Sequence, residues 1–423
     1  MVRNRFRWLV VVLLFAVTVI NYVDRAAIAY AVPDIEAEFG LSSGQIGLIL
    51  GAFAIGYVIT PLFAGVAVDR IGPRLTLAVA AVFWTAAIGL TAAATSFAML
   101  YAARIMLGLA EGPNFPAMSG AVSRWLPPEE RARALAGALV AVPLALAAGA
   151  PLVATLVGSV GWRGAFACLA VLGLLWLPVW LLFFRDGPEQ SRHVTAAERA
   201  HIERGCATDG ALADGGRGGW RILLTTPTLL ANCWAYFVFG YFLFFFMSWL
   251  PDYLRRVYGL ELAQIGLLSV LPWLAGAAAL VAFGQLSDRV LAATGSLRKA
   301  RSLQIAGSQA VAAVAVVPVT LSGDLSVAIA GITVAVAATM AANAAYYVTV
   351  ADLVPRHAGS GLGIMTVAFA FAGFLAPVVT GFVLQLTGTF APAFLLMAAL
   401  AASSVIGVIA FHRPDRDAAR LAA

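Results

Sequence analysis

Four charged side chains lie inside long apolar runs in the first half of this sequence. Asp24 and Arg25 interrupt the first run, and Arg104 and Glu111 lie in the fourth. A charge at the middle of a bilayer costs about 2.5–3.5 kcal/mol on insertion scales, so residues of this kind tend to serve a function. Two arginines and two carboxylates predict a buried site that binds an anion and carries protons. The alternative is two structural ion pairs that hold helices together.

The spacing in the fourth run predicts that its two charges act together. Arg104 and Glu111 are two helical turns apart and share one face, on which Gly108 leaves room for a neighbour or a ligand. A buried carboxylate without a partner favours its protonated form, whereas a nearby arginine favours the ionised form. An anionic substrate that takes over the arginine would therefore lead the carboxylate to bind a proton. This is a physical basis for anion–proton symport.

In the first run, Asn21, Tyr22 and Arg25 form a polar stripe because they are three and four residues apart. Asp24 points about 100° away from Arg25 around the helix axis. We therefore expect these two charges to serve different partners.

The elements that must position these residues are membrane helices. Of the 423 residues, 62% are hydrophobic and 11% are charged, against about 25% charged in an average soluble domain. Runs of about 20 apolar residues are long enough to span a bilayer. The sequence predicts an all-α membrane protein with twelve transmembrane helices near residues 9–30, 45–68, 75–95, 98–121, 134–157, 164–184, 228–250, 262–286, 302–322, 325–350, 359–384 and 390–411.

The distribution of basic residues predicts the orientation of the chain. Twelve spans place nearly all of the 27 Lys and Arg residues on the side of the termini, and only Arg163, Arg255 and Arg256 on the opposite side. The positive-inside rule then puts both termini in the cytoplasm, and we expect a multi-pass protein of a bacterial inner membrane. The net charge of +6 reflects this asymmetry and does not indicate a nucleic-acid partner.

A cleavable signal peptide is the competing interpretation of the N-terminus. It is disfavoured because Asp24 and Arg25 interrupt the apolar run and eleven further spans follow. The three cysteines suggest neither a disulfide framework nor a metal site.

The chain divides into two halves that share a motif. We predict six-helix bundles at 1–184 and 222–423, joined by a polar cytoplasmic linker at 185–221 with a short helix near 196–204 and a flexible glycine run. The second span of each half closes on Gly-x-x-x-Asp-Arg, which indicates an internal duplication. Here the glycine would allow close helix approach, and the charges would latch a neighbouring helix end. The predicted latch residues are Gly65, Asp69, Arg70, Arg74, Gly284, Asp288 and Arg289.

The remaining chemistry is that of carboxylates. The only lysine, Lys299, is not in a phosphate-binding loop, and the four histidines fall in loops or at a span end. No nucleophile–base pair or metal-ligand spacing supports an enzyme. The second half has no Asp, Glu, Lys or Arg within a predicted span and offers neutral groups, among which Tyr236 and Asn343 are candidate substrate contacts.

Two halves of six spans each, with a duplicated motif, resemble the major facilitator superfamily, whose halves rock around a mid-membrane site. Within it, four segments resemble the anion:cation symporter family, which includes sialin and the hexuronate, galactonate and phthalate carriers. These segments are Asn21–Arg25 (NYVDR), Arg104–Pro116 (RIMLGLAEGPNFP), Trp125–Arg131 (WLPPEER) and Gly161–Arg163 (GWR).

This resemblance implies a role for each charged residue. Arg25 would bind the substrate carboxylate, Asp24 and Glu111 would carry protons, and Arg104 would be their partner. The tyrosines that match the family's pocket are Tyr22 and Tyr57.

Three positions depart from the sugar-acid carriers of that family. Pro61, Val142 and Ala370 stand where those carriers tend to have side-chain amides. A buried hydroxyl without a partner is costly. We therefore expect a smaller or more apolar carboxylate than a polyhydroxylated sugar acid.

We expect proton-coupled uptake of an organic carboxylate by a monomer that uses the proton gradient and no cofactor. The alternatives are a proton-coupled efflux antiporter of drugs or metabolites on the same fold, and a transporter-like sensor that moves no solute. The fifth span reads Gly149-Ala150-Pro151 and lacks the Gly-Pro-x-x-Gly-Gly pattern typical of antiporters.

Overall fold

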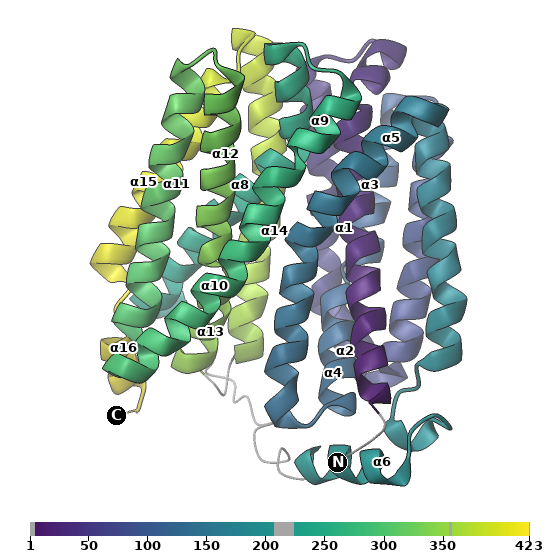
Figure 1. Ribbon diagram of the computed structural model, residues 1–423, viewed down its shortest axis with the longest axis vertical. Helices are drawn as coiled ribbons and strands as arrows, with labels where there is room; N and C mark the ends of the chain where they lie inside the picture. Colours follow the sequence, from purple (N-terminus) through teal and green to yellow (C-terminus); the bar gives the residue numbers. More distant parts are fainter. Residues whose placement is uncertain (1–4, 207–223, 355–357, 423) are drawn as a thin grey trace. The chain divides into compact units, whose positions relative to one another are not determined.

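The computed structural model describes residues 5–206, 224–354 and 358–422, and all regular structure in these ranges is helical (Figure 1). The first half contains α1 (Phe6–Phe39), α2 (Ser43–Ala92), α3 (Phe97–Glu111), α4 (Asn114–Trp125), α5 (Pro128–Phe183), the short turn η1 (Pro188–Gln190) and α6 (Ala196–Cys206).

The second half begins with α8 (Pro227–Tyr258), α9 (Leu262–Leu268) and α10 (Val270–Thr294). A π-helical turn, η2 (Arg298–Ser302), leads into α11 (Leu303–Leu321). The remaining helices are α12 (Leu325–Ala341), α13 (Asn343–Leu353), α14 (Ala358–Thr387), α15 (Ala391–Phe411) and α16 (Pro414–Ala422).

The twelve predicted spans are all helical within the described residues. Ten stretches there are long and apolar enough to cross a membrane. One of them, α5, holds the fifth and sixth spans and breaks at Gly161, whose φ of 70° favours glycine. The fourth span is divided into α3 and α4, each shorter than a full crossing. The prediction of a twelve-helix membrane fold is confirmed.

Two compact units make up the chain. Unit 1 is Met1–Ile35 with Ala52–Ala213, and unit 2 is Glu36–Gly51 with Asp214–Ala423. In unit 2, α8 packs against α14 and α15, α11 packs against α12 and α15, and α10 packs against α12 (Figure 1).

The helix α6 lies where the capping box predicts a short helix, and the Glu198 amide donates to Thr195 Oγ1 at 3.3 Å. The glycine run predicted as flexible, 215–219, lies outside the described residues.

Within unit 1, two glycines bring α2 and α3 into backbone contact. A Cβ added at Gly108 would lie 2.0 Å from the carbonyl oxygen of Phe53, and one added at Gly56 would lie 2.1 Å from that of Ile105. Any larger side chain would separate the two helices. The space that the sequence assigns to a neighbour or a ligand at Gly108 is therefore taken by a neighbouring helix, which holds Phe53 and Tyr57 beside α3.

Candidate functional site

Arg25 and Glu111 form a buried ion pair inside unit 1. Glu111 Oε2 accepts from Arg25 Nη2 at 2.9 Å and from Nε at 3.2 Å, and the two side chains are 1% and 0% exposed. Asn21 Oδ1 accepts a third bond from Arg25 Nη2 at 3.1 Å. Removing one partner of such a pair leaves an uncompensated buried charge, which costs about 3–5 kcal/mol.

Three aromatic rings surround the Arg25 guanidinium. Its Cζ lies 4.2 Å from the ring centre of Phe53, 4.4 Å from that of Tyr22 and 4.9 Å from that of Tyr57. A guanidinium is planar, and such rings stabilise its charge by about 0.5–2 kcal/mol each. With its faces covered, the edge of the guanidinium is where a carboxylate can bind. Phe53 was missed by sequence reasoning, because an apolar residue in an apolar run gives no signal of this role.

Arg104 does not form an ion pair with either carboxylate within the described residues. Its Nη2 donates to the carbonyl oxygen of Arg25 at 3.2 Å, and its Cζ lies 5.7 Å from the ring centre of Phe53. Although Arg104 and Glu111 share a helix face, Glu111 is paired across to α1. The part of Arg104 as a partner of the carboxylates stays a prediction.

Asp24 is fully buried, and neither of its carboxylate oxygens has a hydrogen bond within the described residues. It lies within electrostatic range of Arg104 and Glu111. Arg25 has Glu111 as its ion-pair partner and Asp24 has none among the described residues, so the expectation that the two charges serve different partners stays a prediction.

Buried polar atoms without a hydrogen bond gather around this pair. Leaving such an atom unbonded costs about 1–3 kcal/mol, more for charged groups, so a cluster of them marks a place where a ligand, water or a proton is handled. Among the described residues of α1, α3 and α4, these atoms are Asn21 Nδ2, both oxygens of Asp24, Arg25 Nη1, Nε and Nη1 of Arg104, Glu111 Oε1, and both amide atoms of Asn114.

Unit 2 places one of its two candidate residues, Tyr236, in a neutral network. The hydroxyls of Tyr236 and Tyr347 are hydrogen-bonded at 2.7 Å. Gln309 Nε2 donates to the hydroxyl of Tyr346 at 2.9 Å, and Asn232 Nδ2 donates to its carbonyl oxygen at 3.1 Å. The rings of Phe239 and Phe369 stack on Tyr236 at 5.5 and 5.3 Å between ring centres. Asn343 is buried on α13 and is not part of these bonds; its Oδ1 is unbonded within the described residues.

At the end of the second span, Arg74 bonds to the end of α5. It donates from Nε to the Phe184 carbonyl at 3.0 Å and from Nη2 to that of Leu181 at 2.8 Å. Asp69 and Arg70 are exposed and have no bond to another described residue. An added Cβ at Gly65 would meet no described atom within 4 Å. The close helix approach expected at this glycine is therefore absent from the described contacts.

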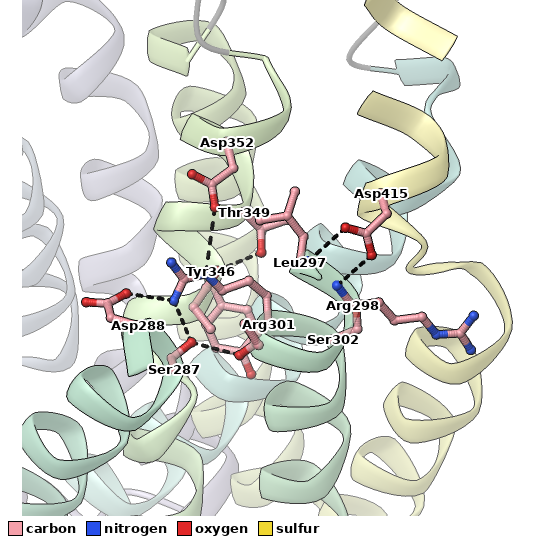
Figure 2. A network of polar contacts seen from close by, with 12 residues as sticks. Ser287, Asp288, Leu297, Arg298, Arg301, Ser302, Tyr346, Thr349, Asp352 and Asp415 are labelled. Atoms are coloured by element: carbon pink, nitrogen blue, oxygen red, sulfur yellow. Dashed lines mark hydrogen bonds and ion pairs between the residues drawn. The ribbon is translucent and has the colours of Figure 1, made fainter. Parts of the chain in front are cut away.

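At the end of the eighth span, the buried Arg301 joins two helix ends (Figure 2). Its Nη1 donates to Asp288 at 3.0 Å and to Ser287 Oγ at 2.5 Å, and its Nε lies 3.7 Å from a carboxylate oxygen of Asp352. A Cβ at Gly284 would be in ordinary contact with Ala344, at 3.9 Å. Arg301 was missed because several basic residues follow this span and their order alone does not say which one turns inward.

Two further charged residues near this span end, Arg289 and Asp415, have different surroundings. Arg289 is exposed and has no bond to another described residue. Asp415, in the first turn of α16, accepts from the backbone amides of Leu297 and Arg298 at 2.8 and 2.9 Å and so fixes the start of η2 (Figure 2). No group of three or more His, Cys, Asp or Glu residues that could hold a metal lies among the residues that the structure describes.

Comparison with known proteins adds family and fold to this geometry. Residues 14–377 match the family model described as Major Facilitator Superfamily. The chain is 33% identical to the "Hexuronate transporter" of Bacillus subtilis, covering 96% of this chain and 94% of the relative. It is 32% identical to the "Probable sulfoacetate transporter" of Cupriavidus necator, covering 90% and 88%. A bacterial homologue of the human lysosomal transporter Spinster, solved in an inward-facing, unoccupied conformation, matches with a TM-score of 0.73 at 19% identity over 98% and 96% of the chains.

Proposed function

The chain belongs to the major facilitator superfamily, and we propose that it is a proton-coupled symporter that takes up a small organic carboxylate by alternating access. The observation that supports this most directly is the Arg25–Glu111 pair, fully buried and surrounded by unbonded polar atoms. Relatives named as transporters of hexuronate and of sulfoacetate are carriers of organic anions. We therefore interpret the site as that of a transporter and not of an enzyme.

The proposed coupling follows from competition for one arginine. A substrate carboxylate that binds the edge of Arg25 takes the place of Glu111, whose Oε2 uses the same Nε and Nη2 atoms. A buried carboxylate that loses its cation is too costly to remain ionised, so Glu111 takes up a proton. Asp24, which has no hydrogen bond within the described residues, is the second proton carrier.

The other assigned residues hold the arginine or shape the pocket. Tyr22 and Tyr57 line Arg25 with their rings, and Arg104 supplies a second positive charge beside the carboxylates. We assign Tyr236 and Asn343 as the neutral contacts that unit 2 contributes. The latch residues at the ends of the second and eighth spans would stabilise one of the two transport conformations.

The cellular setting is part of the proposal. Both termini would lie in the cytoplasm of a bacterial cell, with the chain acting as a monomer in the inner membrane. The proton gradient would drive accumulation. These statements depend on the asymmetry of the basic residues and on the carboxylates of unit 1.

The substrate we propose is a carboxylate with few hydroxyl groups. Val142 and Ala370, which depart from the amides of the sugar-acid carriers, are each buried and apolar; the side chain of Pro61, the third departure, lies outside the described residues. Apolar contact contributes about 25 cal/mol per Å² before binding costs. One relative is named for a hexuronate and the other for sulfoacetate, which has no hydroxyl, so both kinds of anion belong in the first binding screen.

Glu111→Gln in proteoliposomes tests the coupling. The neutral amide mimics the protonated acid, so the variant should lose accumulation driven by an inward proton gradient and keep counterflow exchange of the carboxylate found in a thermal-shift screen. Glu129→Gln, at an exposed carboxylate in the first turn of α5, is the matched control and should transport as the wild type does. Accumulation by Glu111→Gln would make Glu111 structural, and proton-driven export by the wild type would favour the antiporter.

A further inference from the structure

The fourth span is divided into two helices directly after Glu111. Helix α3 ends at Glu111, and α4 begins at Asn114. Gly112 (φ −53°, ψ −36°) and Pro113 (φ −67°, ψ −13°) between them keep right-handed helical dihedrals. Asn114 therefore lies one turn beyond Glu111, and side chains three residues apart on a helix are neighbours at about 5–6 Å between Cβ atoms.

The amide of Asn114 is buried without any hydrogen bond to the described residues. The side chain is 1% exposed, and neither Nδ2 nor Oδ1 has a partner. It also caps no helix, since Pro113 is the N-cap residue of α4 and neither amide atom of Asn114 bonds to a described residue. Other buried amides hold the fold together: Asn21 Oδ1 accepts from Arg25, and Asn232 Nδ2 donates to the Tyr346 carbonyl. Asn114 has no comparable structural bond, although an unbonded buried amide costs about 1–3 kcal/mol.

Unit 2 repeats this arrangement at the corresponding place. Its fourth span is also divided, with α12 ending at Ala341 and α13 beginning at Asn343. Asn343 is 6% exposed, and its Oδ1 is unbonded among the described residues. The same residue type, at the same point of the same span in both halves, with the same unbonded oxygen, is hard to attribute to packing.

We propose that Asn114 is a specificity-determining residue that hydrogen-bonds a hydroxyl group of the bound carboxylate. This inference rests on the proposed transport of a carboxylate at Arg25, and it narrows the substrate to a hydroxycarboxylate. An amide offers one acceptor oxygen and a donor NH₂ group, and a hydroxyl both donates and accepts. A carboxylate or sulfonate oxygen only accepts and would leave Oδ1 unbonded, and a methylene would leave both amide atoms unbonded.

Matched pairs of acids that differ by one hydroxyl test this assignment. Binding of glycolate against acetate, and of mandelate against phenylacetate, is measured by isothermal titration on the full-length protein in detergent. Sites built to bond a hydroxyl reject the analogue that lacks it, so wild-type protein should prefer the hydroxy acid of a pair by about tenfold or more. In Asn114→Leu, a substitution of similar size, the ratio should fall to about one, with binding of the deoxy acid changed less than about twofold.

Thermal stability separates this role from a structural one. Without a bond to lose, ligand-free Asn114→Leu should melt at or above the wild-type temperature, and Asn114→Ser, which retains a donor and an acceptor, should recover part of the hydroxyl preference. Asn232→Leu is the control, because it removes a bonded amide and should lower the melting temperature while the hydroxyl ratio stays unchanged.

The outcomes also distinguish this inference from the proposed function. If Arg25→Lys abolishes binding of both acids while the ratio is the same in wild type and Asn114→Leu, the carboxylate site stands and the assignment of Asn114 is wrong. An equal affinity of wild-type protein for both members of each pair leads to the same conclusion. If no carboxylate binds the wild-type protein, both proposals are overturned.

Discussion

The two units bury polar side chains in opposite ways. In the membrane spans of unit 1 these groups are charged, and several atoms of Asp24, Arg25, Arg104 and Glu111 have no hydrogen bond within the described residues. In the spans of unit 2 they are neutral: tyrosines and amides are joined in pairs such as Tyr236–Tyr347, and single neutral atoms such as Asn343 Oδ1 are left unbonded within the described residues. A partly satisfied charged cluster can change its pairing when a ligand or proton arrives, whereas a bonded neutral network resists change. Unit 1 is therefore suited to coupling, and unit 2 to shape.

The second span of each half ends in different polar contacts in the two units. In unit 1, Arg74 donates to the neutral carbonyl oxygens of Leu181 and Phe184. In unit 2, Arg301 is held by the carboxylates of Asp288 and Asp352. At the end of the second span, charge pairing thus occurs in unit 2 and not in unit 1, although unit 1 pairs Arg7 with Glu130 and Glu198 before its first span.

The largest effect expected from this comparison is that of Arg25→Lys. Lysine keeps the charge but loses the planar fork that binds a carboxylate along its edge and stacks between rings. Because truncating one partner of a buried charged bond costs 2–5 kcal/mol, substrate affinity should fall by about 100-fold. Titration calorimetry measures this, with Arg192→Lys, at an exposed arginine after the sixth span, as control. Unchanged affinity in the lysine variant would mean that the substrate is bound elsewhere.

Arg301→Gln examines the charge pairing of unit 2. The substitution removes the buried guanidinium that bonds Ser287 and Asp288 and leaves the partly exposed Asp352 without its cation, and we expect the free energy of unfolding to fall by about 2 kcal/mol. Thermal melting in detergent reports the change, which should shrink at high salt because Asp288 is largely exposed. Arg289→Gln, at a neighbouring exposed position, should alter stability by no more than about 0.5 kcal/mol. Equal effects of the two substitutions would show that Arg301 does not stabilise the end of the eighth span.

The fold could be predicted almost completely because hydropathy and the bilayer thickness determine it together. All twelve spans appear as helices, and the breaks at Gly72 and Gly161 fall where loops separate predicted spans. The ends of the helices were less predictable. The helix α8 continues past the expected end at residue 250 to Tyr258, where Gly259 caps it in a left-handed conformation, and the buried Asp252 pairs with Arg256 within this extension. Helix capping and local ion pairs set such ends, and a hydropathy pattern does not record them.

The site could be predicted only as far as charge is conspicuous in an apolar run. Asp24, Arg25, Arg104 and Glu111 stood out for this reason, but the pairing of Arg25 with Glu111 across two helices did not follow from their spacing. Phe53 and Asn114 gave no signal, since one is apolar and the other resembles a helix-start residue. Which partner a buried group meets is decided by tertiary contacts such as that between Gly56 and α3.

His412 is an exception to the neutral character of buried groups in unit 2. It is a buried titratable residue that lies just beyond the last span. Its Nδ1 is bonded to Ser302 Oγ at 2.7 Å, and burial lowers its pKa to about 4, although nearby Asp417 opposes this. The unfolded chain, with a His pKa near 6.5, then binds more protons between pH 6.5 and 4. Stability is thus fully present above pH 6.5 and falls as pH drops toward 4, by about 1.5 kcal/mol between pH 6.5 and 5.

Melting temperatures at pH 7.5 and 5 measure this loss. His412→Gln should flatten the pH dependence, and His201→Gln, a partly exposed histidine of unit 1, should not. The same slope in both variants would assign the pH dependence to other groups.

The smallest effect expected is that of Tyr236→Phe, and it decides whether unit 2 contributes shape alone. The substitution removes a hydroxyl bonded to Tyr347 and keeps the ring that stacks on Phe239 and Phe369. A net hydrogen bond is worth about 1 kcal/mol, so substrate affinity should change by no more than about fivefold, with the proton dependence of uptake unaltered. Tyr236→Ala, which also removes the ring, should weaken binding further, since apolar area and stacking are lost together. If Tyr236→Phe instead uncoupled uptake from the proton gradient, the neutral network would take part in proton transfer and the division between the two units would fail.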